Sequence, residues 1–134
     1  MDKGITIPIK TKNYWRDLVE IFDFIPPFSE LRPRGKDVLA LLFEKHYKYI
    51  NLPERERNRL IFDYDTYQEI ADKLSTENYP MNRQGILSLI TYLRSKNFVI
   101  EDQYGHSCLN KKLIIPVSMK ITFNLIPNDT TNGT

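Results

Sequence analysis

The sequence predicts an α+β domain that is mainly helical. Several stretches place apolar residues at the three- and four-residue spacing of a helix face, and the region after the last of them alternates around a glycine. The chain has 134 residues, 41% of them hydrophobic and 27% charged, as is usual for a folded domain. We expect an N-terminal arm with a short helix (1–30), the main domain (31–118), and a C-terminal strand with a mobile tail (119–134).

The composition narrows the class of protein. Cys108 is the only cysteine, so an internal disulfide is excluded. The longest apolar run, 38–43, is far shorter than the ~20 residues that cross a bilayer, and the N-terminus has no signal-peptide core. We expect a soluble cytoplasmic protein with no removed segment and no membrane partner. The net charge of +2 predicts no strong general attraction to nucleic acid, so the placement of the charges decides that question.

The first half of the chain predicts an extended arm and two helices. Alternating isoleucines at 5–9 indicate the arm, and residues 13–24 predict a short amphipathic helix that ends at Pro26. This helix either supplies a dimer contact or covers the core of its own subunit, and we favour the second. Residues 34–49 predict a buried central helix, because their apolar side chains cover more than one stripe. Residues 51–62 predict a loop or one helical turn, followed by a short extended piece.

Two paired helices follow, and each has a start signal. Asp65 with Gln68, or Thr66 with Glu69, has the spacing of a capping box, in which side chains satisfy the first free amides of a helix. Asn82 is placed to cap the second helix of the pair. This second helix has a single apolar face, which consists of Ile86, Leu89, Ile90 and Leu93.

The segment after the paired helices predicts β structure. Asn97 is suited to the left-handed residue that ends a helix. Two extended apolar pieces then flank a turn near Gly105, a pattern typical of a β-hairpin. Residues 120–126 alternate again and predict a further strand, and the polar segment 128–134 predicts a mobile tail.

The stretch 67–100 resembles the winged helix–turn–helix superfamily. The pieces that carry the resemblance are Ile70-Ala71-Asp72-Lys73-Leu74, then Ile86 to Leu93, then Asn97-Phe98-Val99-Ile100. With the preceding helix and the hairpin, the resemblance covers roughly residues 31–116. It implies a winged-helix core, a recognition helix at 82–96 in the major groove of DNA, and a hairpin wing. The link 76–81 is longer than the family's usual tight turn, and Asn97 stands where glycine is common.

Charge placement favours the second paired helix as the side that faces phosphate. Residues 51–79 contain four basic and seven acidic residues, whereas residues 80–97 contain three basic residues and no acid. Asparagine and glutamine suit adenine, arginine suits guanine, and cations in the hairpin and before the central helix suit phosphates. The candidate DNA-binding residues are Asn82, Arg83, Gln84, Ser88, Thr91, Lys111, Lys112 and Arg34.

Several of these residues also have a purely structural interpretation. Asn82 is first of all a helix cap, and Lys111 and Lys112 in the wing are more often a solvated pair than a DNA contact. Gln84, Ser88 and Thr91 form a small neutral surface that suits a protein partner equally well.

No pattern in the sequence indicates catalysis, a cofactor or a metal. His106 and Cys108 are two residues apart, but no further nearby cysteine or histidine completes a zinc site. There is no phosphate-binding glycine loop and no Ser–His–Asp or Cys–His set with supporting spacing. We therefore expect a protein that is not an enzyme.

Two functional hypotheses remain. The first is a non-catalytic protein that binds double-stranded DNA, as a homo-oligomer, in transcription regulation or in phage or plasmid replication. The second is a viral structural or adaptor protein, such as a capsid-associated or head–tail connector component in the virion, which uses the same fold to bind other virion proteins. The modest charge, the neutral helix face and the two extended arms favour the second, because such arms often pair with strands of neighbouring subunits.

Overall fold

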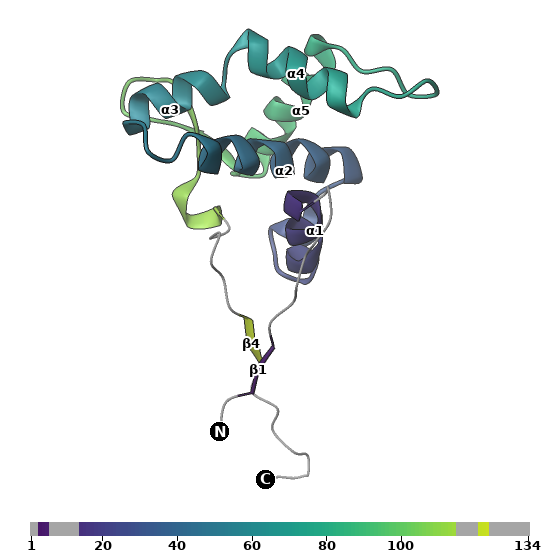
Figure 1. Cartoon of the computed structure of the whole chain (residues 1–134), viewed down its shortest axis with the longest axis vertical. Coiled ribbons are helices and arrows are strands. Elements are labelled where there is room, and N and C mark those ends of the chain that lie inside the picture. Colours follow the sequence, from purple (N-terminus) through teal and green to yellow (C-terminus); the bar gives the residue numbers. More distant parts are fainter. Residues whose placement is uncertain (1–2, 6–13, 115–120, 124–134) are drawn as a thin grey trace.

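The computed structural model describes residues 3–5, 14–114 and 121–123, and this part of the chain is mainly helical with a small antiparallel hairpin (Figure 1). The helices are α1 (Tyr14–Ile21), α2 (Pro33–Lys48), α3 (Glu54–Ile61), α4 (Tyr64–Leu74) and α5 (Arg83–Ser95). The strands are β1 (Lys3–Ile5), β2 (Val99–Glu101), β3 (Ser107–Leu109) and β4 (Ile121–Phe123). Three short 3₁₀ helices are η1 (Phe22–Phe24), η2 (Phe28–Glu30) and η3 (Lys111–Leu113).

Helix α2 is the centre of the fold, as its broad apolar surface predicted. It contacts α1, α3, α4 and α5, and Figure 1 shows α1 on one side of it and α3 and α4 on the other. Val38, Leu39, Leu42 and Phe43 are fully buried in this arrangement. Because other helices contact α2 on several sides, more than one of its faces has to be apolar.

Helix α1 covers the core of its own chain, which confirms the interpretation that we favoured. Leu18 and Val19 are buried against the core. Trp15 stacks on Tyr47 of α2, with ring centres 5.1 Å apart and planes 10° apart. The core therefore includes residues from both 1–30 and 31–118.

Helix α3 has eight residues where we predicted a loop or one helical turn followed by a short extended piece at 60–62, so the predicted helix was too short and the extended piece was wrong. Only Asn58 and Ile61 of this helix are buried, and the charged side chains occupy its other faces. An eight-residue helix with so short a buried edge has no recognisable apolar stripe in its sequence. Arg57 reinforces the helix, since its Nη1 donates a hydrogen bond to the carbonyl of Leu52 in the preceding loop (3.3 Å).

Helix α4 begins earlier than predicted, and both capping-box registers were wrong. The cap is Asp63, whose carboxylate accepts a hydrogen bond from the backbone N–H of Thr66 (2.8 Å). The Thr66 hydroxyl instead donates to the carbonyl of Leu60, and Gln68 bonds to Asp72 along the helix. An aspartate with extended backbone before the first turn competes directly with the later candidates for the free amides.

Both ends of α5 are as predicted. The side-chain oxygen of Asn82 accepts a hydrogen bond from the N–H of Gly85 (2.9 Å), so the cap is confirmed. Asn97 has a φ of 68°, the left-handed conformation expected after the helix. The N–H of Phe98 then donates to the carbonyl of Leu93 (3.0 Å) and returns the chain towards the core.

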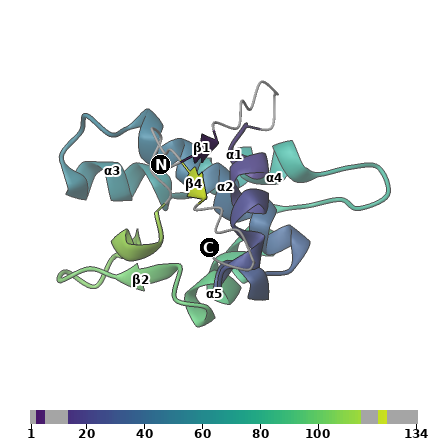
Figure 2. The ribbon, with the colours of Figure 1, turned by 90° about the horizontal axis from the view of Figure 1, so that it is seen from below.

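The predicted hairpin is confirmed, but its lysines lie elsewhere. Strands β2 and β3 pair antiparallel, and Gly105 turns between them with a φ of 79°. Figure 2 shows β2 running out from the end of α5, on the side where α3 lies. Lys111 and Lys112 belong to η3 rather than to the wing. The reason is that β3 ends at Leu109, and the Asn110 side chain then caps η3 by accepting from the Lys112 N–H (3.1 Å).

The two predicted arms pair with each other. Strands β1 and β4 are antiparallel, with Gly4 opposite Thr122, and Figure 1 shows this pair apart from the helices. The strand predicted at 120–126 is thus confirmed for Ile121–Phe123. The remaining arm residues and the predicted tail at 128–134 lie outside the described residues, and pairing with a neighbouring subunit stays a prediction.

Candidate nucleic-acid interface

The exposed side of α5 gathers five of the predicted site residues at one surface. No aspartate or glutamate occurs anywhere in Arg83–Ser95 or at its cap. We call this surface the α5 face, and its exposed side chains are Arg83, Gln84, Ser88, Thr91, Arg94 and Ser95. Asn82 lies at its start.

Arg83 is held in place by an aromatic ring. Its guanidinium carbon lies 4.9 Å from the centre of the Tyr64 ring at the first residue of α4, and Tyr64 is 64% exposed. A cation–π contact restrains the side chain without using its N–H donors as hydrogen bonds. The Arg83 guanidinium therefore remains available to a further partner.

The neutral residues of the α5 face are largely satisfied by their own helix. Asn82 is engaged as the cap, which is the structural role that we expected first. The hydroxyl of Ser88 donates to the carbonyl of Gln84 (3.2 Å), and that of Thr91 donates to the carbonyl of Leu87 (3.1 Å). Both hydroxyl protons are engaged in hydrogen bonds to the backbone. The two hydroxyls can therefore act towards a partner only as acceptors or by packing.

Arg94 joins the α5 face to the hairpin, and our sequence analysis did not select it. Its Nη2 donates a hydrogen bond to the hydroxyl of Ser107 at the start of β3. Arg94 also acts on buried Tyr67. Burial is the main cause that raises the pKa of Tyr67 to about 12, Asp63 adds to the rise, and the charge of Arg94 opposes it. Tyr67 therefore stays neutral beside the arginine. The excess of basic residues in 80–97 was the sequence signal for Arg94. Its contact with Ser107 can be recognised only once the fold is known.

The other three predicted cations belong to different elements. Nη1 of Arg34 on α2 donates to the carbonyl of Leu74 at the end of α4 (3.2 Å) and lies 3.6 Å from a carboxylate oxygen of Asp37. Lys111 pairs with Glu54 of α3 at 2.9 Å. Lys112 is exposed on η3. Arg34 and Lys111 thus have structural partners, and the structure does not place these cations on the α5 face.

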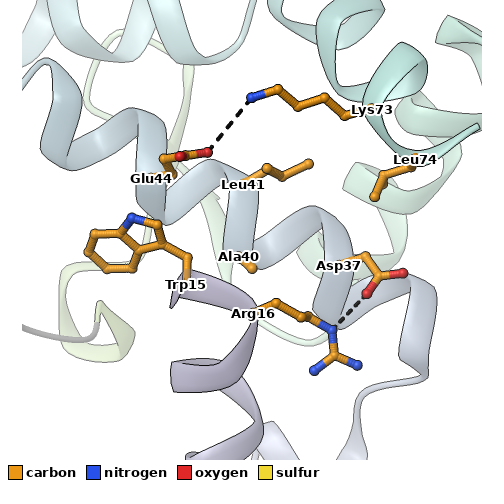
Figure 3. A pocket seen from close by; sticks show the side chains of 8 residues that line it. All are labelled: Trp15, Arg16, Asp37, Ala40, Leu41, Glu44, Lys73 and Leu74. Carbon is orange, nitrogen blue, oxygen red and sulfur yellow. Dashed lines mark hydrogen bonds and ion pairs between the residues drawn. The ribbon is translucent and has the colours of Figure 1, made fainter. Parts of the chain in front are cut away.

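A cavity of about 310 Å³ lies between α1, α2 and α4, and Figure 3 shows the side chains that line it. Two pairs of opposite charge face it: Arg16 with Asp37 at 2.7 Å, and Lys73 with Glu44 at 3.9 Å. Because these charges compensate each other, the cavity has no net preference for a charged ligand.

The described residues contain no group of three or more histidine, cysteine, aspartate or glutamate side chains that could hold a metal ion. Cys108 is buried, and burial raises the pKa of its thiol, which keeps the sulfur protonated and unreactive. None of the helices in the described part of the chain has the length and hydrophobicity that crossing a bilayer requires.

No family model matches the chain, and no curated protein or solved structure matches it significantly.

Proposed function

We propose that this chain is a non-catalytic protein that binds duplex DNA, with α5 as the recognition helix and the β2–β3 hairpin as the wing of a winged helix–turn–helix. The observation that carries the proposal is the acid-free α5 face with an arginine near each end. Arg83 and Arg94 are about 16 Å apart along the helix axis. The major groove is roughly 12 Å wide and admits an α-helix. A helix seated in it brings both arginines within reach of the groove walls.

The long link between α4 and α5 is compatible with this role because hydrogen bonds fix it. The N–H of Tyr79 donates to the Thr76 hydroxyl (3.0 Å), and the N–H of Thr76 donates to the Tyr79 carbonyl (3.1 Å). The N–H of Met81 donates to the Ser75 hydroxyl (2.9 Å). A link fastened at both ends holds the two helices in one arrangement despite its length.

Five residues of the α5 face have a role in the proposal. Arg83 reads a base edge or a nearby phosphate at the start of the helix, and Gln84 reads a base. Arg94 contacts phosphate beside the hairpin. Ser88 and Thr91 supply close packing in the groove. Transcription regulation or phage or plasmid replication is the setting that we propose, with the chain acting as a homo-oligomer.

A protein-binding role in a viral structural or adaptor protein is the second candidate. Phe24 in η1 is 69% exposed, and its neighbour Ile25 is exposed as well. Large apolar side chains side by side on a surface favour a protein contact. The neutral, internally satisfied centre of the α5 face also suits packing against protein.

Fluorescence anisotropy with mixed-sequence duplex DNA tests the first candidate. Arg83→Gln and Arg94→Gln should each weaken binding. Lys48→Gln is the matched control, because it removes the same charge from the exposed end of α2 and should leave binding unchanged. Equal affinities for all four proteins would contradict the proposal. Assemblies that form without DNA and are lost in Phe24→Ser would support the second candidate instead.

A further inference from the structure

A second cleft, separate from the α5 face, lies between α3 and the turn of the hairpin. It has a volume of about 440 Å³. Arg55, Asn58, Arg59 and Phe62 line it from the side of α3, and residues 105–107 line it from the hairpin. The cleft exists because α3 packs against β3.

The cleft has an excess of positive charge. Arg55 and Arg59 are four residues apart and therefore lie on one face of α3. Within the described residues neither forms an ion pair: Arg55 lies 5.0 Å from the centre of the Tyr104 ring, and Arg59 is exposed without a partner. Asp102 of the hairpin is not one of the residues that line the cleft, and its carboxylate already accepts hydrogen bonds from the N–H groups of His106 (3.0 Å) and Tyr104 (2.8 Å).

Asn58 adds a polar group that lacks a partner of its own. It is only 7% exposed, and its side chain makes no hydrogen bond to any other residue in the described part of the chain. The Asn58 amide is not among the fully buried side-chain atoms that lack a partner in the described residues, so it contacts solvent at the wall of the cleft. Its N–H groups are therefore free to donate hydrogen bonds to a ligand that enters the cleft.

We propose that the cleft between α3 and the hairpin binds a phosphate group. Two guanidinium groups, an amide and the hydroxyl of Ser107 are hydrogen-bond donors of the kind that phosphate oxygens accept. The volume leaves room for an organic group beside the phosphate, and the ring of Phe62 offers it an apolar wall. The site does not depend on DNA binding by α5.

The cleft is also connected to the α5 face. Ser107 lines the cleft and accepts the hydrogen bond from Arg94. A phosphate next to Ser107 therefore also attracts the Arg94 guanidinium and draws it towards the hairpin. The phosphate can come from the backbone of a bound duplex or from a free phosphorylated small molecule, and experiment separates these sources.

Titration of the ¹⁵N-labelled full-length chain with inorganic phosphate, at constant ionic strength, tests the proposal. The backbone amide signals of Gly105, His106 and Ser107 should shift and saturate. Arg59→Gln should weaken this binding about tenfold, the usual effect of losing one charged hydrogen-bond donor. Arg55→Gln should act in the same direction. Lys48→Gln, with the same change in net charge, should bind like the wild type. Shifts that never saturate, or equal weakening in the control, would overturn the proposal as non-specific attraction.

The same signals followed with duplex DNA identify the source of the phosphate. If the duplex shifts the amides of residues 105–107 and inorganic phosphate competes with it, the backbone of DNA supplies the phosphate. If the duplex leaves them unshifted while phosphate still saturates the cleft, the ligand is a small phosphorylated molecule. Saturable phosphate binding in a chain that binds no duplex contradicts only the DNA-binding function. Duplex binding without any phosphate response contradicts only the cleft.

Discussion

The guanidinium carbon of Arg83 lies 4.9 Å from the centre of the Tyr64 ring, and this contact links the first residue of α5 to the first residue of α4. Both side chains are exposed, so the contact contributes little to the core. Its effect is to hold a cation at the N-terminal end of the helix that we propose enters the groove. The contact therefore positions a surface cation and adds little to the stability of the domain.

Arg83→Ala should weaken DNA binding by about 1–3 kcal/mol if Arg83 reads a base. Tyr64→Leu keeps the arginine but removes the ring that restrains it, so it should weaken binding less. Both variants should keep the thermal stability of the wild type, because both side chains are exposed. Anisotropy titrations with circular-dichroism melting check this pair. A stability loss as large as the binding loss would show that the contact is structural.

Arg34→Ala should affect stability rather than DNA binding. The Arg34 side chain donates to the carbonyl of Leu74 and lies near Asp37, so it ties α2 to the end of α4. Losing one partly exposed hydrogen bond of this kind costs about 1 kcal/mol. Urea unfolding should therefore show a lower midpoint, with an unchanged salt dependence of DNA binding. A flatter salt dependence of DNA binding in the variant would instead show that Arg34 contacts a phosphate of the DNA.

Two neighbouring substitutions test whether α3 is the helix that the structure shows. Ile61 is 0% exposed and Leu60 is 37% exposed. Ile61→Ala should cost about 2–5 kcal/mol of unfolding free energy because it opens a cavity in the core. Leu60→Ala should cost much less, since its side chain already contacts water. Similar losses for the two variants would contradict the burial of one side of α3.

Stability should fall when the solution becomes acidic, and His46 should be a cause. Burial lowers the pKa of the His46 side chain below its ordinary value of 6.5; the charge of Arg57 acts in the same direction and that of Glu54 against it. The unfolded chain therefore binds a proton on His46 at a higher pH than the folded chain does. This contribution to stability is complete above 6.5 and is lost as the pH falls through the folded pKa.

Urea unfolding of the wild type and His46→Gln measures this effect, at about pH 7.5 and about pH 5.5. The variant cannot take up the proton and should lose less stability between the two conditions than the wild type. An identical loss in both proteins would mean that other groups cause the acid sensitivity.

The parts of the fold that the sequence predicted are those with local signals. The cap at Asn82, the left-handed Asn97 and the turn at Gly105 each act within a few residues, and all three are present. Helix α3 has no such signal, because its stability comes from burying Ile61 against other elements. The cap at Asp63 was missed because two later residue pairs fitted the same rule.

The candidate site also has one part that the sequence predicted and one part that it did not. The α5 face followed from helical spacing, since one helix places Gln84, Ser88 and Thr91 on a common side. The bond between Arg94 and Ser107 and the cleft beside it join segments that are distant in the sequence. No spacing rule connects α3 to the hairpin, so only the packing reveals that they meet.

The salt dependence of duplex DNA binding is the sharpest test of α5 as a DNA-binding surface. Fluorescence anisotropy at a series of salt concentrations gives the slope of the logarithm of affinity against the logarithm of salt. If α5 binds DNA, the logarithm of affinity should decrease linearly, with a slope of about −0.9 for each phosphate contacted, and Arg94→Gln should give a flatter slope. Binding that is absent even at low salt, or that does not change with salt, would contradict the assignment of α5 as a DNA-binding surface.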